Sequence, residues 1–159
     1  MTDKAGKYLT FKLGAEEFGL EILKVQEIIK MMEITKVPRT PEFVRGVINL
    51  RGKVIPVVDL RLKFSMPTVP ITERTCVIVV QVAHSNGAVT MGAIVDEVSE
   101  VLDINGEQIE PTPELGAAVD TDFILGMGKI AKRVVMLLDV DKVLSNKELA
   151  SIGNVTNIA

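Results

Sequence analysis

The sequence is poor in the residue types on which catalysis and covalent cross-linking depend. It has one histidine, His84, and one cysteine, Cys76, in 159 residues. A single cysteine cannot form an intrachain disulfide, and such usage fits a reducing compartment. One histidine and one cysteine cannot supply a zinc site, and no convergent set of titratable groups stands out. We therefore expect no metal, no cofactor and no enzymatic activity.

Aromatic residues and runs of basic charge are also scarce. Tryptophan is absent, aromatics make up 4% of the chain, and 18 Lys and Arg residues are scattered among 21 Asp and Glu residues. A nucleic-acid surface needs a basic stripe for phosphates, and single strands also need aromatic rings for stacking. These absences predict that the protein has no nucleic-acid partner.

Long apolar stretches are missing as well. No segment approaches the ~20 consecutive apolar residues of a membrane-spanning helix, and residues 1–8, MTDKAGKY, lack the apolar region of a signal peptide. We therefore expect a cytoplasmic protein.

What the chain has in abundance is Val, Ile and Leu in short runs, which favours strands. Alternation and turn residues predict three hairpins, with strands over 8–13 and 18–22, over 47–50 and 53–60, and over 75–84 and 88–95. Asp59 and Asp139 each follow an aliphatic run and precede a short helix. Residues 24–32 fit either a helical turn or a strand. The predicted fold class is all-β.

The chain also resembles itself. GLEILKVQEII from Gly19 and GAIVDEVSEVL from Gly92 share their glycine, aliphatic, valine and glutamate positions. Gly46 precedes Asp59 by thirteen residues, and Gly126 precedes Asp139 by the same number. Chance similarity among Val-rich strands is the alternative explanation. A duplicated β unit is the better one, and it predicts two small open barrels side by side.

We place the boundary between the two subdomains in the Pro-rich segment near residue 70. The expected units are residues 8–70 and 71–150, between which terminal strands could be exchanged. Residues 1–7 and 151–159 are expected to be flexible tails.

The two halves differ at one hairpin turn. Asn49-Leu50-Arg51-Gly52 aligns with Lys129-Ile130-Ala131-Lys132, so the arginine is confined to the first half. An arginine on a rigid strand end offers a planar set of donors to a partner's carboxylate or carbonyl. A structural role, in which Arg51 pairs with Glu27 and pins the hairpin, is equally compatible with the sequence.

The stretch GVINLRGKVIPVVDLR (46–61), preceded by FGLEILKVQEII (18–29) and VPRTPEFVRG (37–46), resembles the CheW family of chemotaxis coupling proteins. The similarity runs from about Tyr8 to Leu149. It implies two five-stranded SH3-like barrels around a common core. It also implies an adaptor between the cytoplasmic tip of chemoreceptors and the regulatory domain of the histidine kinase CheA. The protein would then meet the inner membrane only indirectly, in receptor arrays.

The resemblance also implies which residues carry coupling. By motif match, receptor and kinase coupling falls on Val25, Glu27, Gly46, Asn49, Leu50 and Arg51. A weaker transfer places Ile28, Cys76, Val77 and Val98 in an apolar groove between the subdomains.

Two other functions remain open at this stage. A paralogous coupling module of a pilus-motility or developmental system would share the fold and the mechanism. A polyproline-binding SH3-type module would need an aromatic-lined groove, for which five Phe and one Tyr give thin support.

Overall fold

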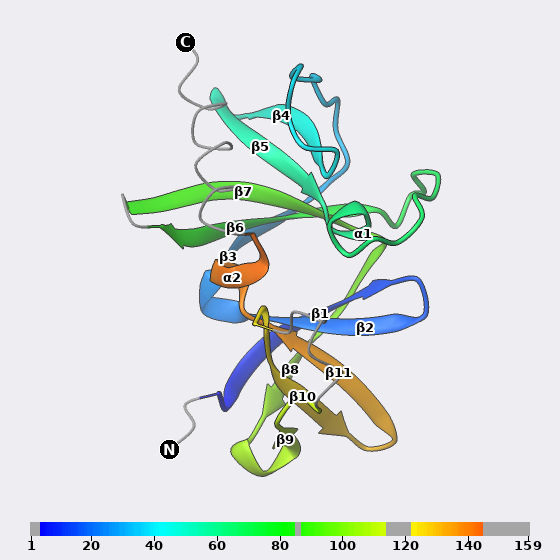
Figure 1. Ribbon diagram of the computed structural model, residues 1–159, viewed down its shortest axis with the longest axis vertical. Coiled ribbons are helices and arrows are strands. Elements are labelled where there is room, and N and C mark those ends of the chain that lie inside the picture. The colour runs from blue at the N-terminus through cyan, green and yellow to red at the C-terminus, as the bar shows by residue number, and fades with distance from the viewer. Residues whose placement is uncertain (1–3, 85–86, 114–121, 145–159) are drawn as a thin grey trace.

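The computed structural model describes residues 4–84, 87–113 and 122–144. Eleven strands in this part of the chain form two sheets, one above the other in Figure 1. The strands are β1 (Gly6–Leu13), β2 (Glu16–Glu21), β3 (Val25–Lys30), β4 (Val44–Leu50), β5 (Lys53–Asp59), β6 (Cys76–His84), β7 (Gly87–Val95), β8 (Glu97–Ile104), β9 (Ile109–Glu110), β10 (Ile124–Ile130) and β11 (Arg133–Leu138). The predicted all-β fold is confirmed.

Each sheet curls into a small open barrel. We call β3–β7, in the order β3-β6-β7-β5-β4, the continuous barrel, because one stretch of chain builds it. We call the other sheet, β8-β1-β2-β11-β10-β9, the split barrel, because both ends of the chain contribute to it. The continuous barrel has the expected five strands, and the split barrel gains a sixth through the two-residue β9. An antiparallel bridge between Thr35 and Val47 connects the segment after β3 to β4.

The internal duplication is confirmed by the strand pairing. Val57 of β5 lies opposite Gly92 of β7 in a parallel pair, and Leu137 of β11 lies opposite Gly19 of β2 in the same way. These pairs join the positions that the sequence repeat aligns. The two repeats therefore fold alike and are related by an approximate two-fold arrangement.

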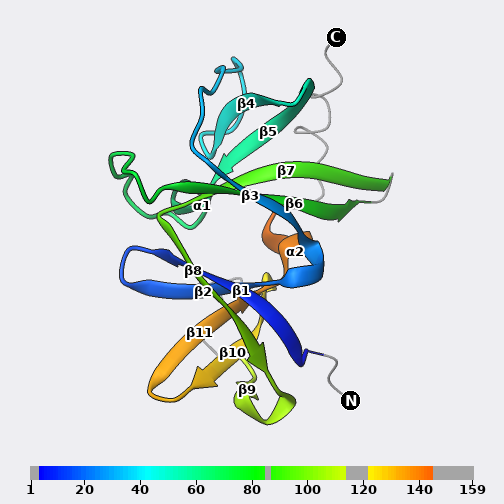
Figure 2. The ribbon, with the colours of Figure 1, turned by 180° about the vertical axis from the view of Figure 1, so that it is seen from behind.

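The boundary at residue 70 separates the repeats but not the barrels. Each repeat gives its first hairpin to the other: β1–β2 joins β8–β11, while β6–β7 joins β3–β5. The chain therefore crosses between the barrels after β2 and again after β7, as Figures 1 and 2 show from opposite sides. β1 also begins inside the expected N-terminal tail, because Gly6 and Lys7 pair with Ile104 and Asp103 of β8. The expected tail 151–159 lies outside the described residues.

Short helices form where aspartates were expected to cap them. Asp59 precedes α1 (Leu60–Lys63) and Asp139 precedes α2 (Val140–Val143). Each carboxylate accepts a hydrogen bond from the backbone N–H two residues later, at 3.0 and 3.1 Å. The ambiguous segment 24–32 resolves into the end of the 3-10 turn η1 (Ile22–Lys24) followed by β3. A second such turn, η2 (Gly106–Gln108), precedes β9.

The largest hydrophobic core lies between the barrels rather than inside either one. It gathers side chains from both sheets and both α-helices, among them Leu20, Val58, Ile78 and Leu138. Four of the five phenylalanines stack in sequence within and beside it, Phe11 on Phe18, Phe18 on Phe64 and Phe64 on Phe123. Smaller clusters fill the continuous barrel and the split barrel. The two barrels therefore share one core.

Candidate functional site

The hairpin between β4 and β5 presents Arg51 in a strained but well-defined turn. Arg51 and Gly52 both have positive φ, 52° and 86°, as a tight two-residue hairpin turn requires. The Asn49 side-chain oxygen accepts a hydrogen bond from the Gly52 backbone N–H at 2.8 Å. Asn49 therefore fixes the turn, and the Arg51 side chain is not needed for it.

Arg51 forms an ion pair with Glu27 of β3. Glu27 lies in β3 and Arg51 directly follows β4, and these two strands are the first and last of the sheet order. The ion pair therefore spans the opening of the continuous barrel. The arginine side chain is 69% exposed and the glutamate 32% exposed. An exposed pair of this kind contributes only ~0–1 kcal/mol to stability. The N–H donors of Arg51 are thus accessible to a partner, and breaking the ion pair to reach that partner would reduce the stability of the protein only slightly.

A hollow of about 370 Å³ lies beside this pair. Its lining combines both members of the pair with aliphatic and polar neighbours, namely Gln26, Glu27, Leu50, Arg51, Gly52, Lys53, Ile55 and Thr90. The structure therefore brings together three residues that the motif match had singled out, Glu27, Leu50 and Arg51. Gln26, Lys53 and Thr90 belong to the same hollow and were not identified from the sequence.

Gly46 sets the course of β4 toward this site. The pairing of β4 with β5 shifts register between Val44 and Gly46, which marks a β-bulge. A Cβ atom on Gly46 would lie 2.1 Å from the carbonyl oxygen of Thr35. No other residue type fits there without moving the Thr35–Val47 bridge. The role of Gly46 in the structure is therefore backbone packing, buried beneath the surface.

Two other predicted site residues, Val25 and Ile28, lie in β3, which is the edge strand of the continuous barrel. Val25 pairs with Val80 and packs half-buried against the largest core. Ile28 is 43% exposed, which is consistent with a contact surface.

The other groove residues are dispersed. Cys76 is half-buried and its thiol donates to the Arg74 carbonyl oxygen at 3.3 Å. Val98 packs against the largest core. Val77 is fully buried inside the continuous barrel and cannot line an open groove. β6 lies between β3 and β7 with both faces covered, so its apolar run did not reveal which side chains point outward.

A network of charged residues around Arg45, at the start of β4, was not identified from the sequence. Arg45 of β4 donates to Asp59 at 2.9 Å, and Arg61 holds Asp96 through two hydrogen bonds, one of them 2.8 Å long. The Arg61 guanidinium, with help from the Gly14 backbone N–H, holds the pKa of Asp96 below its usual range. The repeat alignment could have pointed to both arginines, because Leu125 and Asp141 stand at their positions in the second half.

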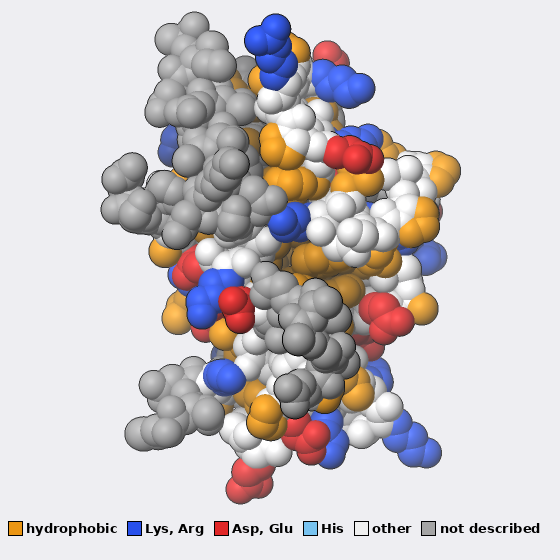
Figure 3. Space-filling view, in the orientation of Figure 1, with side chains coloured by type: hydrophobic (Ala, Val, Ile, Leu, Met, Phe, Trp, Pro, Cys, Tyr) orange, Lys and Arg blue, Asp and Glu red, His pale blue; other side chains and the backbone are white. Residues whose placement is uncertain are grey.

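On the face shown in Figure 3, acidic and basic side chains are interspersed rather than gathered in a basic stripe. Within residues 4–84, 87–113 and 122–144, no group of three or more His, Cys, Asp and Glu side chains is arranged to hold a metal ion. Over the same residues, no helix has the length and apolar character needed to cross a membrane.

Comparison with known proteins gives a consistent result. The family model described as CheW-like domain matches residues 7–148. A chemotaxis protein CheW from Klebsiella aerogenes is 42% identical over 149 residues, covering 94% of this chain and 87% of that protein. One from Bacillus subtilis is 34% identical over 146 residues, covering 91% and 90%. The crystal structure of the scaffolding protein TtCheW from Thermoanaerobacter tengcongensis superposes with a TM-score of 0.79 at 36% identity, covering 91% of this chain and 97% of that one. The chain therefore belongs to the CheW-like domain family.

Proposed function

We propose that this chain is a chemotaxis scaffold that couples chemoreceptors to the histidine kinase CheA, and that the coupling depends on the Arg51–Glu27 pair. Family membership supports the scaffold role. One observation supports the choice of site: Arg51 stands exposed in a turn that Asn49 and Gly52 already stabilise. At the equivalent position in the split barrel an alanine, Ala131, has nearly the same φ, 54° against 52°.

The physical mechanism is recognition of an amphipathic helix. The receptor tip would present a helix whose apolar face packs on aliphatic residues and whose polar flank meets the charged pair. Leu50, half-buried, lines the hollow beside Arg51 next to the buried Ile55, and Ile28 is exposed on β3. Such a contact is small, at or below ~800 Å² per partner, so many weak contacts in an array would supply the affinity.

The effect on the kinase is a shift between its conformations. A scaffold changes kinase activity only if it binds one kinase conformation more tightly than another. We propose that the chain does this without catalysis of its own and that it remains in the cytoplasm, recruited to receptor arrays at the membrane.

Two alternatives differ in what they predict. A coupling module for pilus motility or development would use the same site with other receptors, and a binding assay with receptors of each class separates the two. A polyproline-binding module needs an open aromatic groove, whereas Phe11, Phe18, Phe64 and Phe123 stack upon one another in or beside the core.

The test is reconstitution with a receptor cytoplasmic fragment and CheA. We expect the chain to co-sediment with both proteins and to raise receptor-dependent kinase activity over the same mixture without it. The matched control is a variant that keeps the fold but removes the pair, Glu27→Ala with Arg51→Ala. Equal kinase activity with the chain, with the variant and without either would refute the proposal.

A further inference from the structure

A continuous chain of hydrogen bonds links the split barrel to the strand that carries Arg51. It starts at Asp96, the single residue between β7 and β8. The Asp96 backbone N–H donates to the Lys12 carbonyl oxygen at 3.1 Å, and its carboxylate accepts from the Gly14 N–H at 2.7 Å. Asp96 is therefore fastened to the β1–β2 hairpin, at a point where the chain crosses between the barrels.

Arg61 of α1 is the next member of this chain. Its guanidinium holds both carboxylate oxygens of Asp96, and its side chain is only 11% exposed. A bidentate pair of this kind is stronger and more directional than an exposed single contact. The Arg61 backbone N–H in turn donates to one carboxylate oxygen of Asp59 at 3.0 Å.

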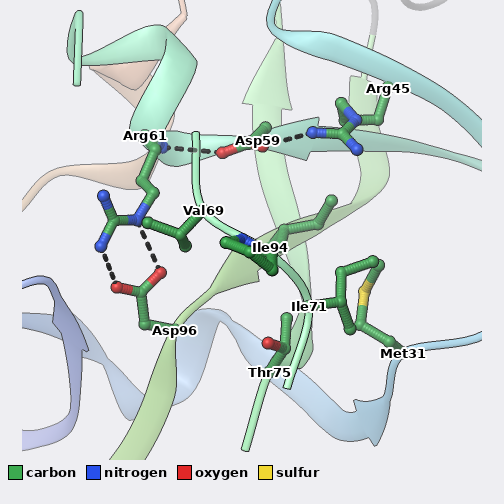
Figure 4. Close-up of a pocket in the computed structure, with 10 residues that line it drawn as sticks. Met31, Arg45, Asp59, Arg61, Val69, Ile71, Thr75, Ile94 and Asp96 are labelled. Atoms are coloured by element: carbon green, nitrogen blue, oxygen red, sulfur yellow. Dashed lines mark hydrogen bonds and ion pairs between the residues drawn. The ribbon is translucent and has the colours of Figure 1, made fainter. Parts of the chain in front are cut away.

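Asp59 connects α1 to β4. Its side chain is 8% exposed, and its second oxygen accepts from Arg45 Nη1 at 2.9 Å. Arg45 is the residue between Val44 and Gly46, where the pairing of β4 with β5 skips one residue. Figure 4 shows the whole series, from Asp96 through Arg61 and Asp59 to Arg45.

The hollow among these side chains is too small to be a ligand site. It encloses about 30 Å³, room for about one water molecule. The four charged side chains on its wall are paired with one another rather than aimed at an empty space. Their arrangement fits a mechanical role.

The bulge at Arg45 is the point at which this chain of hydrogen bonds can change the direction of β4. A β-bulge bends its strand and sets the twist of the residues beyond it. Beyond this bulge β4 runs through Asn49 and Leu50 directly to Arg51. Anchoring Arg45 to Asp59 therefore fixes the direction in which the hairpin presents Arg51 to Glu27.

The second repeat lacks the last part of this link. The other crossover, after β2, is also clamped by an ion pair, Lys24 of the first repeat with Asp141 of α2 at 2.8 Å. Asp141 aligns with Arg61, so the acidic and basic partners are exchanged between helix and crossover. The bulge residue of β10 is Leu125, which no ion pair can anchor. Of these two equivalent hairpins, β4–β5 has its bulge residue tied by ion pairs to a crossover, and β10–β11, as far as the described residues show, does not.

We propose that Asp96, Arg61, Asp59 and Arg45 are positioning residues that hold Arg51 in place against Glu27 and tie its orientation to the junction between the barrels. The effect of these four residues on coupling rests on the function proposed above for the Arg51–Glu27 pair. Their effect on the geometry of the β4–β5 hairpin is independent of that function.

The test uses Arg45→Met in the full chain, which keeps the aliphatic part of the side chain and removes the bond to Asp59. The matched control is Arg133→Met. Arg133 is a similarly exposed arginine in the split barrel that pairs with Glu17 and Glu100 and lies outside the link. If Arg45→Met fails to fold because Asp59 is left unpaired, the double variant Arg45→Met with Asp59→Asn removes that charge and keeps an oxygen for the Arg61 N–H.

Two measurements, amide NMR signals and kinase activity, distinguish a positioning effect on the hairpin from a general loss of protein stability. We expect Arg45→Met to shift the amide NMR signals of residues 49–53 and to lower receptor-dependent kinase activity several-fold, whereas Arg133→Met does neither. We expect Arg45→Lys, which keeps a charged donor, to restore part of the activity. Unchanged signals at residues 49–53 overturn the proposal.

The proposal is also overturned if the signals shift and coupling stays normal while Arg51→Ala abolishes coupling. If Arg51→Ala itself leaves coupling intact, the proposed function is wrong. The NMR signals then still decide whether the link positions the hairpin.

Discussion

Arg51 and Ala131 occupy equivalent positions in the two repeats and both have positive φ, 52° and 54°. Each residue begins the turn between two paired strands, β4–β5 in one barrel and β10–β11 in the other. A residue with a Cβ atom is strained in this conformation. Because an alanine takes the equivalent position, the Arg51 side chain is not needed for this φ, and we expect its role to lie in the contacts that it makes.

Glycine at either position should stabilise the protein. The left-handed conformation costs a non-glycine residue ~1–2 kcal/mol, and glycine loses ~0.5–1 kcal/mol of this advantage through its greater freedom in the unfolded chain. We expect Ala131→Gly to raise the free energy of unfolding by about 0.5–1 kcal/mol in urea titrations, and Arg51→Gly to raise it by less, because that variant also loses the pair with Glu27. Only Arg51→Gly should reduce coupling. Destabilisation of both variants would contradict the strain assigned to these turns.

Much of the fold follows from local sequence. The hairpin turn at Arg51-Gly52 and the helices after Asp59 and Asp139 follow from turn and cap residues that act over a few positions. The pairing of Arg51 with Glu27 was one of two readings of the same hairpin. It is confirmed as a contact, and it is compatible with a partner-binding role.

The exchange of hairpins between the barrels was not fixed by the sequence, because it depends on which distant strand β2 and β7 pair with. The β4 bulge depends on long-range register in the same way, so the link through Arg45 was missed. The sequence left open whether Val77 is buried or lines a groove, because β6 is covered on both faces at Val77–Val80. An apolar run of this kind carries no alternation to show which side chains point outward.

Gly46 should be far less tolerant of substitution than Gly52. A Cβ on Gly46 would meet the Thr35 carbonyl oxygen at 2.1 Å, whereas one on Gly52 would meet nothing within 4 Å. We expect Gly46→Ala to lower the free energy of unfolding by about 3 kcal/mol or more, from overpacking and backbone strain together. Gly52→Ala should lower it by only ~0.5–1 kcal/mol, because the strain is partly offset by the smaller freedom of alanine in the unfolded chain. Equal losses in thermal or urea unfolding would show that the close approach at Gly46 is relieved by small movements.

Asp96 should make stability depend on acidity. Its folded-state pKa is depressed by Arg61 and by the Gly14 N–H, so below the ordinary carboxyl value the unfolded state binds more protons than the folded state. The contribution of the pair is present above that ordinary value, about 4, and is lost as pH falls through the folded-state pKa. We expect the loss of unfolding free energy below pH 4 to be smaller in Asp96→Asn than in the parent chain. Identical pH profiles for the two proteins would contradict the role given to this pair.

Phe18 should be the most sensitive position of the core between the barrels. It stacks on Phe11 at 5.6 Å and on Phe64 at 5.8 Å between ring centroids, and it is 4% exposed. Phe18→Ala should reduce the free energy of unfolding by ~3–5 kcal/mol. Val134→Ala, at a site that is 60% exposed, serves as the control and should change it by less than ~0.5 kcal/mol. A single unfolding transition is expected in both variants, and two separate transitions would show that the barrels unfold independently.

The most direct test of the coupling site is receptor-dependent CheA activity with Arg51→Ala in place of the parent chain. The measurement should be made beside Arg133→Ala and with unfolding curves for all three proteins. We expect Arg51→Ala to lower the activity several-fold while its unfolding midpoint stays close to that of the parent, because an exposed pair contributes only ~0–1 kcal/mol. Arg133→Ala should retain the activity. Full activity with Arg51→Ala would contradict the assignment of coupling to this site, and loss of its unfolding transition would show that Arg51 is required for the fold.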